Sequence, residues 1–369
     1  MAKKTIAFVT YILLHGGAER VLTTLANHLC KKYNVIIITL KDHPSFYPLH
    51  PEIQHLHCNL SAESSSSGLN RIREYFNTLQ TLKQLIRDNK VDLVVSFMTV
   101  VNIFSILAAK QSKLPCIISE RNNPVANPPT RFWKILRNLT YRFCSLLIVQ
   151  TKANGKFYKA FTPAEKVHIV PNPLSKELAA KRIVPRPEKK EIKNILSVGR
   201  LDKNKSQDLL IKAFSRVENQ GWKVIIVGEG DEEANYRNLA KELAIETQIE
   251  LVGSQQKIWD FYNHADIFAF TSKSEGFPNA LIEALYFGVP SVSTDCPHGP
   301  SELIAHGENG FLIPVGSQNK LEYYLEKMMK SEELRTSLSE KALASSKAYE
   351  ADEIMNIWET HITELLSDR

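Results

Sequence analysis

The sequence predicts an α/β protein made of two Rossmann-like, doubly wound domains that face each other across a cleft. Short apolar runs alternate with helical patterns, and this alternation restarts after a charged stretch near the middle of the chain. The length of 369 residues is also more than one ordinary hydrophobic core accommodates. Hydrophobic residues make up 43% and charged residues 23% of the chain, which is typical of a soluble globular protein.

The first domain is expected over residues 1–175. Apolar residues from Ala18 to Leu29 recur at helical spacing between the first two predicted strands, which indicates a strand–helix–strand unit. The Ser-rich stretch 61–67 is predicted to be a flexible loop. The predicted strands of this domain are 6–10, 35–40, 93–97, 116–119 and 146–150.

A charged stretch with two prolines, 176–193, is predicted to be a linker. A second domain is expected over 194–345, followed by an amphipathic C-terminal helix over 346–369. Ligands of open α/β sheets bind at the carboxyl ends of the strands, so the loops that follow the strands are the candidate site. The predicted strands of the second domain are 195–198, 224–227, 249–252, 267–270 and 291–294.

The segment 272–283 carries the strongest chemical signal. It places Glu275 and Glu283 eight residues apart around a Gly-Phe-Pro-Asn turn that follows an apolar strand. Asn279 is predicted to cap the helix that begins there. The N–H groups at a helix start attract anions, and carboxylates accept hydrogen bonds from hydroxyl groups. This combination suits a ligand that has both a phosphate and a sugar, such as a nucleotide-sugar.

Two further loops follow predicted strands. Arg200 and Lys205 lie five residues apart before a helix, where they could neutralise a diphosphate from two sides. Gly16 and Gly17 precede the first helix, where backbone N–H groups could approach a ligand closely, although an ordinary tight turn explains them equally well. The Gly-x-Gly pair at 228–230 lacks the third glycine of a dinucleotide-binding fingerprint.

Several metal and redox motifs are absent from the sequence. It contains no Asp-x-Asp bracket for a metal-bound diphosphate and no complete P-loop, so no metal is expected. His55 and His57 alternate on one face of a predicted strand, which favours a structural role over a metal site. The five cysteines form no C-x-x-C pair, and their odd number favours a reducing, cytoplasmic compartment.

Charge is distributed unevenly. Residues 1–175 carry 22 basic and 9 acidic side chains, a net charge of +13, whereas the remainder carries 24 and 31, a net charge of −7. The basic half is therefore expected to face an anionic partner, either a membrane surface or a nucleic acid. No recognised nucleic-acid motif accompanies the dispersed basic residues, so no nucleic-acid partner is expected.

Together these segments resemble family 4 glycosyltransferases of the GT-B fold over essentially the whole chain. The Glu-x7-Glu block with Gly-Phe-Pro carries most of the resemblance, and the Gly-Gly loop, the Gly-Arg-Leu…Lys segment and Gly-Glu-Asn-Gly-Phe-Leu occur in the family's order. Within the family, the chain is similar to bacterial transferases that extend undecaprenyl-pyrophosphate-linked, O-antigen or capsule glycans.

The resemblance implies a UDP-sugar donor and a catalytic role for Glu275, Arg200 and Lys205. Arg200 and Lys205 would neutralise the diphosphate, Glu275 would hold the sugar hydroxyls, and Glu283 would hold the ribose. Many relatives have a His where this chain has Arg121, so a sugar contact is expected from Arg121 or Asn122 instead. The remaining implied donor-binding residues are Gly16, Gly17, Gly276, Phe277, Pro278, Asn279 and Ala280.

The family also implies retention of anomeric configuration and a lipid-linked glycan as acceptor. Such an acceptor requires a membrane-facing surface, which the amphipathic segment 131–143 is predicted to supply on the cytoplasmic face of the inner membrane. A helix that packs on its own sheet is the alternative for this segment. The predicted membrane residues are Arg131, Trp133, Lys134, Arg137 and Arg142.

Two other functions stay open at this level. A UDP-sugar epimerase of the same fold would release an isomerised sugar without using an acceptor. A basic nucleic-acid-binding protein is the remote alternative, which salt-sensitive binding of oligonucleotides would indicate. The donor sugar, a hexose or an N-acetylhexosamine, is not determined by these motifs.

Overall fold

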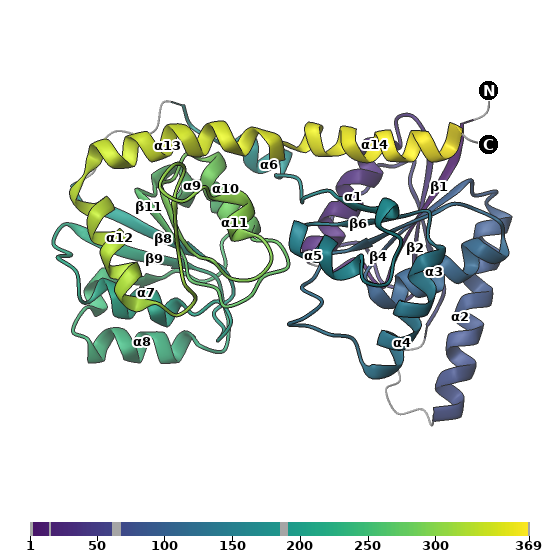
Figure 1. The fold of residues 1–369 in the computed structure, drawn as a ribbon, viewed down its shortest axis with the longest axis horizontal. Coiled ribbons are helices and arrows are strands. Elements are labelled where there is room, and N and C mark those ends of the chain that lie inside the picture. The colour runs from purple at the N-terminus through teal and green to yellow at the C-terminus, as the bar shows by residue number, and fades with distance from the viewer. Residues whose placement is uncertain (1–2, 15, 61–67, 185–190, 368–369) are drawn as a thin grey trace. The chain divides into compact units, whose positions relative to one another are not determined.

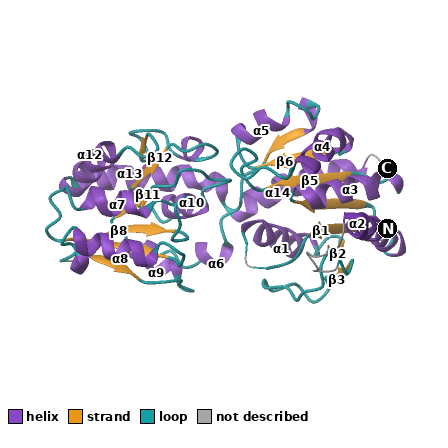
Figure 2. Cartoon of the chain, turned by 90° about the horizontal axis from the view of Figure 1, so that it is seen from below, coloured by secondary structure: helices purple, strands orange, loops and turns teal. Residues whose placement is uncertain are grey.

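The computed structural model describes residues 3–14, 16–60, 68–184 and 191–367, and divides into two compact units. Unit 1 comprises residues 1–172 together with 354–369, and unit 2 comprises residues 173–353. Both units have an open parallel sheet with helices on its two faces (Figures 1 and 2). The predicted loop 61–67 lies outside the described residues.

The sheet of unit 1 has the strand order β3-β2-β1-β4-β5-β6-β7, and every pairing in it is parallel. The order reverses between β1 and β4, as it does in other doubly wound sheets. The five predicted strands are present, and β3 and β7 complete the sheet. The strands are β1 (Thr5–Thr10), β2 (Asn34–Thr39), β3 (Gln54–His57), β4 (Leu93–Phe97), β5 (Cys116–Glu120), β6 (Leu146–Val149) and β7 (Val167–Ile169).

Alternate residues of these strands enter two separate hydrophobic clusters. Ile6 and Phe8 of β1 pack on one face of the sheet, and Ala7 and Val9 pack on the other. A strand buried on both faces reads as a continuous apolar run, which is why such runs predicted the sheet. The helices of unit 1 are α1 (Gly17–Leu29), α2 (Gly68–Asp88), α3 (Thr99–Gln111), α4 (Arg131–Thr140), α5 (Lys152–Tyr158) and most of α14 (Ala351–Ser367).

Unit 2 repeats the pattern with the order β10-β9-β8-β11-β12-β13. Here the reversal lies between β8 and β11. The strands are β8 (Lys193–Val198), β9 (Trp222–Val227), β10 (Ile249–Leu251), β11 (Ile267–Phe270), β12 (Ser291–Thr294) and β13 (Phe311–Ile313). The helices are α6 (Lys176–Ala179), α7 (Gln207–Phe214), α8 (Glu233–Glu242), α9 (Ile258–His264), α10 (Asn279–Tyr286), α11 (Pro300–Leu303), α12 (Gln318–Lys330) and α13 (Glu332–Ser346).

Two segments differ from their predicted roles. The described parts of the predicted linker 176–193 belong to unit 2, where Leu178 is buried and Arg182 donates to the carbonyl of Tyr286 at 3.0 Å; residues 185–190 lie outside the described structure. The C-terminal helix begins at Ala351 rather than at 346. Its apolar face, which includes Trp358, joins the core of unit 1.

Candidate active site

The predicted donor-binding loops of unit 2 both follow strands at the point where the strand order reverses. Residues 199–206 connect β8 to α7, and residues 271–278 connect β11 to α10. Since β8 and β11 are parallel neighbours, their carboxyl ends lie side by side. Two segments that are about 70 residues apart in the sequence are thus adjacent at the edge where open α/β sheets bind ligands.

Glycines allow the loop after β9 to pack closely against the loop after β8. A Cβ atom on Gly228 would lie 2.0 Å from the carbonyl oxygen of Gly199, and one on Gly230 would lie 2.2 Å from that of Leu201. Gly228 also has a φ of 142°, a conformation that side chains disfavour. The Gly-x-Gly pair therefore serves close packing between loops of unit 2.

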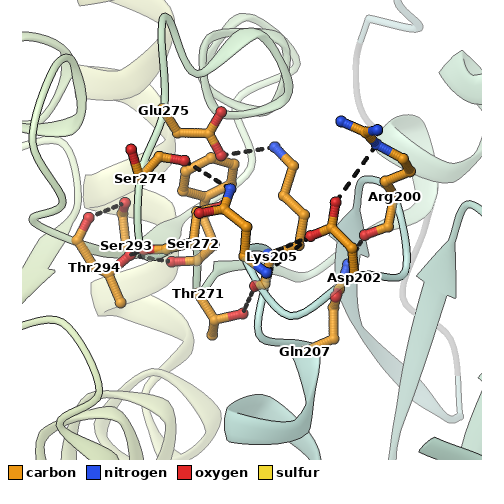
Figure 3. A network of polar contacts seen from close by, with 12 residues as sticks. Arg200, Asp202, Lys205, Gln207, Thr271, Ser272, Ser274, Glu275, Ser293 and Thr294 are labelled. Atoms are coloured by element: carbon orange, nitrogen blue, oxygen red, sulfur yellow. Dashed lines mark hydrogen bonds and ion pairs between the residues drawn. The ribbon is translucent and has the colours of Figure 1, made fainter. Parts of the chain in front are cut away.

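Hydrogen bonds join the two site loops directly (Figure 3). The amide of Lys273 donates to the carbonyl of Asn204 at 2.7 Å, and the Asn204 side chain donates to the carbonyl of Ser274 at 2.8 Å. The hydroxyl of Thr271 donates to the carbonyl of Lys205 at 2.9 Å. These contacts join the backbone next to Lys205 to the backbone just before Glu275.

Lys205 and Glu275 form an ion pair, with Lys205 Nζ 2.7 Å from Glu275 Oε1. The side chains are 20% and 10% exposed, so solvent screens the pair less than it screens a surface pair. The Lys205 ammonium also lies 5.4 Å from the centre of the Phe270 ring. An ammonium group has three donors, so Lys205 can hold Glu275 and still donate to a phosphate oxygen.

Arg200 is placed differently from Lys205. Its side chain is 79% exposed, and its Nε lies 3.5 Å from Asp202 Oδ2. The other carboxylate oxygen of Asp202 accepts hydrogen bonds from the amides of Asn204 and Lys205 at 3.0 and 2.8 Å. Asp202 therefore shapes the loop that positions both cations. The sequence reasoning missed this residue, although an Asp two residues before an Asn is a recognisable turn signal.

The start of α10 differs from the predicted cap. The helix begins at Asn279 itself, and the capping residue is Pro278, which offers no side-chain hydrogen bond. The prediction that Asn279 caps the helix is therefore wrong, because the amides of Leu281 and Ile282 bond to the carbonyl of Pro278 instead. Phe277 is buried, and its ring packs near the ring of Tyr349. This packing anchors the turn.

Gly276, Asn279 and Ala280 are partly exposed around this turn, between Glu275 and the first turn of α10. The loop that follows β12 closes against it: a Cβ atom on Gly299 would lie 2.4 Å from Cδ of Pro278. Burial raises the pKa of the Cys296 thiol in this loop to about 12, with a further contribution from the charge of Glu275. The loop that carries Glu275 therefore contacts both the loop after β8 and the loop after β12.

Glu283 lies on α10 and is 8% exposed. The hydroxyl of Tyr262 on α9 donates to Glu283 Oε2 at 3.0 Å. A buried carboxylate that is oriented by a tyrosine is a preorganised acceptor for ligand hydroxyls. The sequence indicated Glu283 but not Tyr262, since an aromatic residue on a helix carries no distinctive signal.

In unit 1, Gly16 precedes α1, and a Cβ atom on it would lie 2.2 Å from the Glu19 carboxylate. Gly17 is the first residue of the helix. The Glu19 carboxylate is the end of a flexible side chain that can move aside, and Gly16 has an extended φ of −162°, so the local packing does not require glycine at this position. An approach of this loop to a diphosphate stays a prediction.

Arg121 points into unit 1. Its Nε donates to Ser119 Oγ at 2.8 Å, and its guanidinium donates to Asn172 Oδ1 at 2.9 Å. It also lies 5.4 Å from the ring of Trp358, and burial lowers its pKa to about 9. This placement favours a structural role for Arg121. Asn122, the other predicted sugar contact, lines a cavity instead.

Helix α4 and the turn after it expose three of the five residues predicted for the membrane surface, but not Arg137. Arg137 is only 1% exposed, and its guanidinium lies over the ring of Phe161 at 5.0 Å. It lies near the fully buried Glu120. Burial raises the pKa of the Glu120 carboxyl, and the positive charge of Arg137 offsets part of this rise. Including Arg137 in the membrane set was therefore wrong. Trp133 is half-buried, and Arg131, Lys134 and Arg142 are exposed.

Comparison with known proteins places the chain in a family. Residues 15–178 match the family described as Glycosyltransferase Family 4, and residues 176–344 match Glycosyl transferases group 1. A GalNAc-α-(1→4)-GalNAc-α-(1→3)-diNAcBac-PP-undecaprenol α-1,4-N-acetyl-D-galactosaminyltransferase of Campylobacter jejuni subsp. jejuni serotype O:2 is 30% identical over 363 residues, which cover 98% of both chains. The chain belongs to glycosyltransferase family 4.

Solved structures support the fold of this family 4 glycosyltransferase. The apo form of the lipopolysaccharide outer core galactosyltransferase WaaB has a TM-score of 0.82 at 20% identity, and the match covers 98% of this chain and 99% of WaaB. HepE from Anabaena in complex with UDP has a TM-score of 0.79 at 19% identity, covering 98% and 100% of the two chains. The predicted fold class and enzyme class are confirmed.

Proposed function

We propose that this family 4 glycosyltransferase transfers a hexose or N-acetylhexosamine from a UDP-sugar to a lipid-linked oligosaccharide of a bacterial surface glycan. The Lys205–Glu275 pair carries the proposal, because it sets a cation for phosphate beside a carboxylate for sugar hydroxyls. The UDP bound to HepE supports the nucleotide, and the name of the Campylobacter relative supports a lipid-linked acceptor.

The proposed donor site uses the residues at the carboxyl edge of the unit 2 sheet. Lys205 and Arg200 neutralise the diphosphate, and Glu283 accepts hydrogen bonds from the ribose hydroxyls. Glu275 accepts hydrogen bonds from the sugar. Backbone N–H groups at 276–280 donate to the sugar and the phosphate in this proposal.

The reaction we propose retains the anomeric configuration and uses no metal. The acceptor hydroxyl attacks the anomeric carbon from the face on which UDP departs, so the new C–O bond forms as the bond to phosphate breaks. The departing phosphate oxygen takes the proton of the hydroxyl. Catalysis then consists of positioning the two substrates and of stabilising the negative charge on departing UDP. Arg200 and Lys205 supply that stabilisation.

A membrane surface on unit 1 would bring the lipid-linked acceptor to the enzyme. Four large apolar side chains of α4 and the turn after it are 45–56% exposed, and they alternate with the exposed Arg131, Lys134 and Arg142. Apolar side chains interspersed with cations fit an anionic lipid surface. We therefore place the enzyme on the cytoplasmic face of the inner membrane. The apolar set is Phe132, Ile135, Leu139 and Phe143.

No helix in the described part of the chain is long and apolar enough to cross a membrane.

Product analysis tests the proposed activity, with EDTA present, using UDP-sugars and a short pyrophosphate-linked glycan. We expect elongation by one sugar and its loss in Glu275→Ala. Glu242→Ala, at an exposed position at the end of α8 and outside the site loops, is the control. Isomerisation of the UDP-sugar without elongation would contradict the proposal.

A further inference from the structure

A buried hydroxyl of unit 2 holds the carboxylate to which the proposed function assigns the ribose. The Tyr262 hydroxyl donates to Glu283 Oε2 at 3.0 Å, and it also lies 3.3 Å from the carbonyl oxygen of Ala280 in the first turn of α10. Tyr262 is fully buried, whereas Glu283 keeps 8% of its surface exposed. A ligand can therefore touch Glu283 but not the tyrosine that holds it.

The ring of Tyr262 is fixed by its aromatic neighbours. It stacks on Phe287, the residue after α10, with ring centres 5.3 Å apart and planes inclined by 29°. It also lies 6.0 Å from the ring of Phe268 on β11, and both neighbours are buried. A ring packed among buried rings cannot turn without opening the core, so the hydroxyl keeps its place.

Helix α9, which carries Tyr262, is also tied to a separate segment of unit 2. The side chain of Asn263 accepts from the amide of Ile183 at 2.9 Å and donates to the carbonyl of Lys181 at 2.9 Å. Asn263 is buried, so water competes little for these two bonds. The Tyr262 hydroxyl is thus anchored through its ring and through its helix before any ligand binds.

This anchoring affects Glu283 because a glutamate side chain loses much rotational freedom when it is ordered. Hydrogen bonds to charged groups are stronger than those between neutral groups, so a fixed hydroxyl can keep the carboxylate in one orientation. The side chain is then already ordered in the folded protein. A ligand that binds Glu283 gains affinity, since less ordering remains to be done on binding.

The ligand that suits a fixed carboxylate carries hydroxyl groups. A carboxylate offers acceptors and no donors, and ribose presents two neighbouring hydroxyl groups that donate. A deoxyribose would cover the carboxylate without giving a hydrogen bond in return. Sites built around a hydrogen bond to a hydroxyl reject analogues that lack the hydroxyl.

We propose that Tyr262 is a positioning residue of the donor site and that, by holding Glu283, it makes the enzyme select ribonucleotides over deoxyribonucleotides. This role rests on the proposed function, which places the ribose beside Glu283. Tyr262 itself contacts no substrate. Removing its hydroxyl should therefore weaken only those interactions that pass through Glu283.

Calorimetric titration of the full chain, without acceptor, compares UDP with 2′,3′-dideoxy-UDP. We expect the wild type to bind UDP about 100-fold more tightly than the dideoxy analogue. Tyr262→Phe keeps the stacked ring. It should weaken UDP binding by about 10-fold and leave the affinity for dideoxy-UDP within about 2-fold, because that ligand does not use Glu283. A general loss of packing would weaken both ligands alike, so equal losses would overturn the role of Tyr262.

Tyr286→Phe is the matched control. It removes a hydroxyl from the last residue of α10, whose ring packs against the Arg182 guanidinium at 4.6 Å, and both ligands should bind as they do to the wild type. Glu283→Ala provides a second test, since Tyr262→Phe should have no further effect on UDP affinity once the carboxylate is absent. Fully additive losses would show that Tyr262 does not act through Glu283.

Kinetics with the sugar donor separates Tyr262 from the catalytic residues. Tyr262→Phe should raise the KM for the UDP-sugar by about 10-fold and keep kcat within about 3-fold, because the ribose is held equally in the ground state and the transition state. An unchanged KM would refute the positioning role. Selective binding of UDP without transfer to any acceptor would refute the proposed function but not the role of Tyr262. Sugar transfer together with equal affinity for UDP and dideoxy-UDP would refute the ribose selectivity and leave the proposed function in place.

Discussion

At the scale of single residues, the Lys205 ammonium is held in place more firmly than the exposed Arg200 guanidinium. It reaches Glu275 at 2.7 Å, and its backbone is held by Asp202 and Thr271. Little reorganisation is therefore required when a diphosphate arrives. A fixed cation stabilises developing charge better than a mobile one, because its ordering is already part of the folded state.

Replacing Lys205 should consequently reduce turnover. We expect Lys205→Ala to lower kcat by on the order of 10²-fold or more, because the charge that stabilises departing UDP is lost. Steady-state kinetics measures this effect. Lys203→Ala, at an exposed position of the same loop, is the control and should stay close to the wild type. Near-normal turnover in Lys205→Ala would remove Lys205 from the catalytic set.

The ion pair also predicts coupling between its members. Once Lys205 is absent, Glu275 loses its partner, so a second replacement at Glu275 should cost less than it does in the wild type. A double-mutant cycle with Lys205→Ala and Glu275→Ala measures this difference in kcat. Strictly additive losses would mean that the two side chains act independently.

A third residue-scale prediction concerns the pH dependence of stability. The Lys32 ammonium donates to Glu359 at 2.7 Å and lowers the pKa of that carboxyl, with a smaller contribution from His28. Because the pKa is lower in the folded state, the stabilisation is present above the unfolded pKa and is lost as pH falls through the folded pKa. Glu359 joins α14 to α1 within unit 1.

Glu359→Gln should therefore reduce stability by up to about 1 kcal/mol near neutral pH, and the difference should shrink below about pH 4.5. Hydrogen exchange of unit 1, compared between variant and wild type at several pH values, provides the measurement. Glu353→Gln, at an exposed position of the same helix, controls for the loss of a charge. A deficit that persists undiminished in acid would show that the ion pair is not its cause.

At the scale of elements, the sequence allowed the sheets to be predicted but not the orientation of α4. Continuous apolar runs such as Ile36–Ile38 are buried on both faces, so each strand had a clear signal. The 3.6-residue period of α4 shows that it is amphipathic but does not tell which face packs inward. Arg137 is inside because aromatic rings of later segments surround its guanidinium.

The same reasoning applies to the candidate site. Glu275, Glu283, Arg200 and Lys205 could be predicted because their motif is local and lies next to strand ends. Tyr262 could not, since its contact with Glu283 joins helices that are separate in the sequence. The cavity of unit 1 depends on the meeting of α2, α3 and α4, which no local pattern determines.

The exposed face of α4 predicts binding to anionic membranes. Ile135→Asp combined with Leu139→Asp should abolish cosedimentation with vesicles of anionic phospholipid, because each charge must be desolvated at the lipid interface. Reversing Arg131, Lys134 and Arg142 to Glu should weaken binding by removing about 1 kcal/mol per cation. Ile357→Asp places a charge on an exposed apolar site of α14 and is the control. Unchanged binding in both α4 variants would refute the membrane surface.

At the scale of the whole molecule, each unit has its own core, but unit 1 is not continuous in sequence. Its core includes Trp358, which is fully buried and stacks on Phe97 of β4 with ring centres 5.9 Å apart. The Arg121 guanidinium contacts both of these rings, at 5.6 Å from the centre of Phe97 and 5.4 Å from that of Trp358. The last residues of the chain therefore complete the hydrophobic core of the first domain.

Removing the Trp358 ring should accordingly destabilise unit 1 selectively. Truncating a buried Trp typically costs about 3–5 kcal/mol, and here it would leave Phe97 and the Arg121 guanidinium facing a cavity. Hydrogen exchange followed by mass spectrometry can compare the units, since a single unfolding midpoint is ill-defined for a two-unit chain. In Trp358→Ala we expect faster exchange in β1 and β4 and unchanged protection in β8 and β11. Ile357→Ala, at a position 40% exposed on the same helix, should alter neither unit. Equal loss of protection in both units would show instead that their stabilities are coupled.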